Sequence, residues 1–129
     1  MKLYLASFLE SENHGPGRKI AIANPKKYPI DGVFKFFIPS DHISDQYKRL
    51  QESDQQLAGE FFRSMYKRQL SDFVDEVKKE AKINNTTVIE QLPFQDGDTL
   101  LSWERYAFTH YRNIAAEYLE ELGFEVVQR

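Results

Sequence analysis

The chain has 129 residues, and because a compact domain typically holds roughly 100–200 residues, we expect one domain. Its composition, 41% hydrophobic and 29% charged, is that of a globular protein, and the absence of cysteine excludes disulfides, thiolate nucleophiles and cysteine metal sites. The 17 basic and 20 acidic residues give a net charge of −3, which argues against a dedicated binder of nucleic-acid backbones.

Short strands and loops are predicted for the N-terminal part of the chain. Residues 2–7 alternate in polarity and predict a first strand, and the glycines and proline within residues 10–17 predict a loop. Residues 18–23 predict a second strand. The segment 24–29 breaks it, because prolines cannot donate to a strand ladder. Residues 33–38 predict a third, aromatic-rich strand that ends at Pro39.

Helices are predicted for the middle of the chain. Ser40 and Asp41 are suitable caps for a short helix over residues 43–50. From about residue 53 to residue 81, apolar residues recur at four-residue spacing, which predicts one long amphipathic helix or two with a bend. Residues 84–87 predict a break, and residues 88–92 a short helical turn.

The C-terminal part predicts a strand, a helix and a strand. Residues 99–103 are the best candidate for a central strand, an apolar face over 111–122 predicts a helix that stops at Gly123, and 124–127 predict a final strand. Such a crossover is right-handed and places its two strands parallel. We therefore expect a single α/β domain over residues 1–129, with a small, twisted, mainly parallel sheet and helices packed on its faces.

The junction after the strand at 99–103 is the predicted site, because ligands of α/β sheets bind at the carboxyl ends of strands. Glu104 follows an apolar run, and a carboxylate in such surroundings suits a general acid or base. The alternatives are an ion pair with Arg105 or Arg112, or a carboxylate that satisfies free N–H groups at the helix start.

Two further residues of this junction have open interpretations. Arg112 in the first turn of a helix opposes the helix dipole and needs a compensating partner, which is Glu104, an anionic ligand or both. His110 is either an acid–base group or an exposed cap residue.

Residues 100–119 run from an apolar strand through Ser102 and Glu104 to His110, Tyr111 and Arg112. This segment resembles the C-terminal signature of the family catalogued as domain of unknown function 488, in which an apolar strand ends in Cys-x-Glu and is followed by Cys-His-Arg and a helix. Weaker agreement covers residues 17–22 and 61–70.

The resemblance implies a fold and a retained pocket for an anion or a sugar, and it implies no particular reaction. Glu104 and Arg112 keep their identity. Ser102 stands where the family usually has its first cysteine, and His110 and Tyr111 stand where it has Cys-His. Chemistry that depends on a thiol is therefore impossible in this chain.

Other polar residues are candidates for the same pocket. Ser7 ends the first strand, and Arg18 closes a glycine-containing loop that can approach phosphate closely. Tyr66 lies on an apolar helical face and could bring its hydroxyl to the pocket. The alternatives are a plain connecting loop and a core tyrosine with a satisfied hydroxyl.

The sequence thus predicts binding of an anionic, nucleotide-like or phosphorylated small molecule at the carboxyl ends of the strands. If the protein is an enzyme, the predicted catalytic residues are Glu104 and His110. The predicted ligand-binding residues are Arg112, Arg18, Ser7, Tyr66 and Ser102. The alternatives are a non-catalytic protein that sequesters the same ligand and a protein-interaction module.

No cofactor is predicted, and the three histidines are too scattered to indicate a metal site. No apolar run approaches the roughly 20 residues that span a bilayer, and the N-terminus lacks the pattern of a signal peptide. We therefore expect a cytoplasmic protein without membrane partners.

Overall fold

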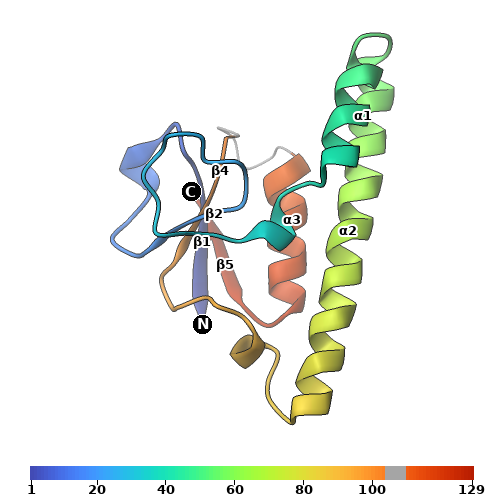
Figure 1. The fold of residues 1–129 in the computed structure, drawn as a ribbon. Helices are drawn as coiled ribbons and strands as arrows, with labels where there is room; N and C mark the ends of the chain where they lie inside the picture. The colour runs from blue at the N-terminus through green and yellow to red at the C-terminus, as the bar shows by residue number, and fades with distance from the viewer. Residues whose placement is uncertain (104–109) are drawn as a thin grey trace.

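The computed structural model describes residues 1–103 and 110–129, which form a five-stranded, all-parallel sheet and three α-helices (Figure 1). The strands, in the spatial order β3-β2-β4-β1-β5, are β1 (Lys2–Ser7), β2 (Lys19–Ala21), β3 (Gly32–Val33), β4 (Thr99–Ser102) and β5 (Glu125–Gln128). The helices are α1 (Asp41–Gln51), α2 (Gln55–Asn84) and α3 (His110–Glu121). The predicted α/β fold with a parallel sheet is confirmed.

The order of the strands explains why the helices share one face of the sheet. The connection from β3 to β4 through α1 and α2 and the connection from β4 to β5 through α3 advance in the same direction across the sheet. Right-handed crossovers that advance in one direction lie on one face. Figure 1 shows α2 and α3 together on that side. The connections from β1 to β2 and from β2 to β3 run the opposite way and contain no α-helix.

Alternation along the strands divides the core into two clusters. The larger cluster joins the sheet to α2 and α3 and includes Leu3, Leu5, Ile20 and Leu100. The smaller cluster lies on the opposite face and is built from Ala6, Phe8, Ala21 and Leu101. Loop residues rather than helices cover this second face, among them Tyr28, Ile30 and Trp103.

The predicted helices are confirmed at their caps. Ser40 Oγ accepts a hydrogen bond from Ile43 N at 3.3 Å and begins α1. Asp54 accepts from Leu57 N at 3.1 Å and begins α2, which is a single helix. Gly123 follows the last turn of α3 with a φ of +107°, the conformation expected of a glycine that ends a helix. None of the described helices combines the length and the apolarity needed to cross a membrane.

The predicted strand over residues 33–38 is wrong for most of its length. β3 covers only Gly32–Val33, and Lys35–Phe37 form a short 3-10 helix, η2. Phe34 and Phe37 are the buried aromatic residues of this segment, whereas Phe36 is 61% exposed. A spacing of three residues between buried side chains suits a 3-10 turn, not the two-residue alternation of a strand. The second strand is also shorter than predicted and ends at Ala21.

Gln69 of α2 fixes the segment that leads into α1. Its side-chain nitrogen donates to Phe36 O at 3.1 Å and to Ile38 O at 2.8 Å, and its side-chain oxygen accepts from Ser40 N at 3.0 Å. An amide both donates and accepts, so one side chain satisfies three main-chain groups of the segment between β3 and α1. This explains a polar residue within the apolar stripe of the long helix.

We predict that Gln69→Met lowers the free energy of unfolding by about 2 kcal/mol, because it removes all three bonds. Gln69→Glu should cost at least as much, since a carboxylate cannot donate to the carbonyls of Phe36 and Ile38. Urea unfolding measures both changes. Gln56→Met, an exposed change on the same helix, is the control and should stay within about 0.5 kcal/mol of the wild type. Equal stability of all these variants would contradict the role given to Gln69.

Candidate functional site

A cavity of about 710 Å³ lies at the carboxyl ends of β2 and β4 and is lined by residues of α1, α2 and α3. Its volume falls within the roughly 300–1,000 Å³ of small-molecule sites. Figure 1 shows α1 and the start of α3 at the end of the sheet where β4 ends. The described residues that line it include Tyr47, Lys48, Gly59, Phe62, Ser102, Trp103 and Tyr111.

Gly59 leaves open space where α2 passes the cavity. A Cβ at this position would have no atom of another part of the protein within 4 Å, so the packing of neighbouring groups does not require a glycine. Glycine inside a helix costs about 1 kcal/mol relative to alanine. The residue therefore lowers helix stability and leaves the cavity wider.

Tyr111 and Tyr66 form a stacked pair behind the cavity. Their rings lie 4.9 Å apart with an interplanar angle of 12°. Tyr66 is fully buried, and its hydroxyl donates to Phe37 O at 2.6 Å. The Tyr111 hydroxyl donates to Phe37 O at 3.1 Å and also contacts Ile22 O. Tyr111 is one of the described lining residues of the cavity, and Tyr66 is not. The hydroxyl of Tyr66, a predicted ligand group, bonds to the main chain.

Trp103 lines the cavity with a ring that is held in place from two directions. Its indole N–H donates to Asn24 O at 2.7 Å. The ring packs against Phe8 with centroids 4.4 Å apart. Both contacts hold the indole in its position on the cavity wall.

The two predicted serines are neighbours at the end of the sheet. Ser7 of β1 and Ser102 of β4 are register partners, and both side chains are buried. Ser7 Oγ accepts from Leu9 N at 3.1 Å. Ser102 lines the cavity, and its hydroxyl has no hydrogen-bond partner among the residues that the structure describes.

Arg112 is fully buried and connects α3 to the sheet. One of its terminal nitrogens donates to Leu5 O at 2.9 Å and to Arg129 O at 2.8 Å. The sequence predicts that a cation in the first turn of a helix needs a compensating partner. The structure provides main-chain carbonyls of β1 and of the chain end for this purpose. A role for Arg112 in ligand binding stays a prediction.

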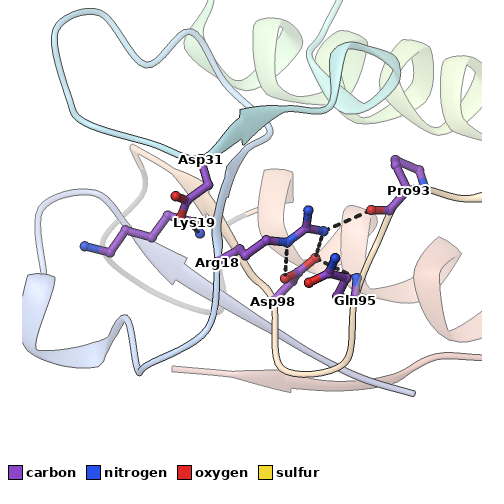
Figure 2. Close-up of polar contacts among 6 residues, drawn as sticks. All are labelled: Arg18, Lys19, Asp31, Pro93, Gln95 and Asp98. Carbon is purple, nitrogen blue, oxygen red and sulfur yellow. Dashed lines mark hydrogen bonds and ion pairs between the residues drawn. The ribbon is translucent and has the colours of Figure 1, made fainter.

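Arg18 lies at the other end of the sheet, before β2 begins (Figure 2). It forms a two-pronged ion pair with Asp98, at 3.0 Å from Nε and 2.7 Å from a terminal nitrogen, and also donates to Pro93 O. The hydrogen bond with Asp98 raises the pKa of Arg18. The structure therefore brings Ser102 to the cavity but does not bring Arg18 there.

The predicted catalytic residues are not placed by the structure. Glu104 and the side chain of His110 lie outside the described residues. Their catalytic roles stay predictions.

No protein-family model, curated protein or solved structure matches this chain. The resemblance to the family of domain of unknown function 488 therefore stays a prediction.

Sequence reasoning missed most of the cavity. Tyr47 and Lys48 line it only because α1 packs against α2, a contact that periodicity does not predict. Gly59 carried a usable signal, since a glycine inside an otherwise helical pattern indicates a packing or functional reason.

We predict that Arg112→Met lowers the free energy of unfolding by about 3 kcal/mol, because it removes buried, charge-assisted hydrogen bonds. Arg68→Met, on the exposed side of α2, is the control and should change stability by less than about 0.5 kcal/mol. Denaturant unfolding measures both. If Arg112→Met is as stable as the control, its main-chain bonds do not hold α3 to the sheet.

Proposed function

We propose that this chain binds an anionic small molecule with a flat ring, of the nucleotide-like class, in the cavity at the carboxyl ends of β2 and β4. One observation carries the proposal: aromatic rings and a lysine line the same cavity. The rings belong to Tyr47, Phe62, Trp103 and Tyr111, and the lysine is Lys48. Aromatic side chains stack on bases of any sequence, and a lysine is a common partner of phosphate.

Lys48 supports the anionic part of the proposal. It lies in the last turn of α1 with an exposed side chain, and no carboxylate among the described residues forms an ion pair with it. In a chain with a net charge of −3, this ammonium provides a local positive charge at the cavity.

The position of the cavity in the fold also supports the proposal. The connection that leaves β4 passes on the helical face, whereas Tyr28 and Ile30 of the connection that leaves the neighbouring β2 pack on the opposite face. In open α/β sheets, ligands bind outside the carboxyl ends of strands whose connections diverge in this way.

We predict that nucleoside monophosphates bind the wild-type chain and that substitutions of residues that line the cavity weaken this binding. Lys48→Met should raise the Kd of adenosine monophosphate by about tenfold, because it removes a charge-assisted bond. Gly59→Leu should weaken binding by narrowing the cavity, and ribose phosphate, which lacks the ring, should bind more weakly than the nucleotide. Isothermal titration calorimetry measures each Kd.

Two controls accompany this experiment. Lys67→Met removes an exposed lysine that does not line the described cavity and should leave the Kd unchanged. Gly59→Ala should raise the free energy of unfolding by about 1 kcal/mol, which shows that a side chain is tolerated there. If the wild type binds none of the four common nucleoside monophosphates, or if Gly59→Leu binds them as well as the wild type does, the proposal is wrong.

A separate prediction distinguishes turnover from sequestration. If Glu104 is the acid–base group, Glu104→Gln abolishes conversion of a bound nucleotide while its Kd changes by less than about threefold. Mass spectrometry of the nucleotide after incubation measures the conversion. Recovery of unchanged nucleotide from the wild type contradicts the catalytic hypothesis and favours a sequestering protein.

A further inference from the structure

Ser102 is a buried polar side chain in a largely aromatic cavity. It is the last residue of β4, and it is only 1% exposed. Alternation along β4 turns Ser102 to the same face as Leu100, which packs in the helical core, whereas Leu101 faces the opposite side. Its side chain therefore points toward the space between the sheet and the helices, where the cavity lies.

The hydroxyl of Ser102 has no hydrogen-bond partner within the described part of the chain. Most buried polar groups of folded proteins have a partner, so an exception calls for an explanation. Ser7, the register partner of Ser102, has one: its Oγ accepts from Leu9 N at 3.1 Å. A ligand atom in the cavity would be the missing partner of Ser102.

We infer that the Ser102 hydroxyl bonds to a heteroatom of the ligand's ring, so that the site selects heteroaromatic rings over hydrocarbon rings. This inference rests on the proposed function and deepens it. A hydroxyl both donates and accepts, and it can therefore pair with a ring nitrogen, a carbonyl oxygen or an exocyclic amine. Nucleobases carry these groups along their edges, whereas a phenyl ring carries none.

Two polar groups of the cavity, the Ser102 hydroxyl and the Lys48 ammonium, determine how the ligand is oriented. Ser102 is buried at the end of β4, and Lys48 is exposed on α1. The polar edge of the ring points inward to Ser102, and the anionic group points outward to Lys48. A site that bonds to a polar group of its ligand rejects an analogue without that group, because its own buried group is then left without a partner.

The test compares adenosine and uridine monophosphates with phenyl phosphate, by calorimetry on the wild type and on Ser102→Ala. We expect Ser102→Ala to raise the Kd of a nucleotide by about tenfold and to change that of phenyl phosphate by less than about twofold. Ser64→Ala, the control, should leave every Kd unchanged, because this exposed serine of α2 does not line the described cavity. The unfolding midpoint of Ser102→Ala should not fall, since no bond within the described protein is lost.

The outcomes separate this inference from the proposed function. If the wild type binds neither these probes nor the other two common nucleoside monophosphates, both fail. If the wild type binds nucleotides and Ser102→Ala binds them equally well, or loses phenyl phosphate to the same extent, the inference fails and the proposed function stands. If Ser102→Ala does not fold, Ser102→Cys replaces it. Because a thiol is a weaker donor than a hydroxyl, Ser102→Cys should weaken nucleotide binding, by less than the tenfold expected of Ser102→Ala, and should leave the Kd of phenyl phosphate unchanged.

Discussion

The handedness of the connections between parallel strands is the constraint on which the rest of this structure depends. Both helical connections advance across the sheet from β3 toward β5, and right-handed crossovers then place every α-helix on one face. The α1–α2 hairpin and the start of α3 consequently meet over the carboxyl ends of β2 and β4. Their side chains enclose the cavity there, and the loops that connect β1, β2 and β3 cover the other face.

The cationic side chains described here have two roles: some stabilise the fold, and one lines the cavity. Arg112 donates to main-chain carbonyls of the sheet, and Arg18 pairs with Asp98 at the opposite end of the strands. Lys48, on the short helix α1, is the cation among the described lining residues. The cavity therefore combines a buried hydroxyl from β4, aromatic walls and an exposed ammonium, an arrangement suited to a ligand that is flat at one end and charged at the other.

Local patterns in the sequence predict much of the fold, because they reflect local physics. The four-residue spacing of apolar side chains, the Ser40 cap and Gly123 each predict a helix boundary or face that the structure has. The third strand fails because Phe34 and Phe37 are buried three residues apart in a turn that Gln69 holds from another helix. Most of the cavity lining was also not predicted, because it depends on contacts between elements that lie apart in the sequence. Tyr47 and Phe62 come together only through the packing of α1 on α2. Ser102 was predictable because it lies at the carboxyl end of the predicted central strand.

The most direct test of the central claim, that the ligand binds between the helices at the carboxyl ends of β2 and β4, is a map of backbone amide chemical shifts during titration with uridine monophosphate. The shifts should cluster at residues 47–48, 59–62 and 102–103, which come from three separate parts of the chain, while the amides of Arg18 and Asp98 stay unchanged. Shifts that cluster around Arg18 and Asp98 instead, or that scatter over the surface, would contradict it.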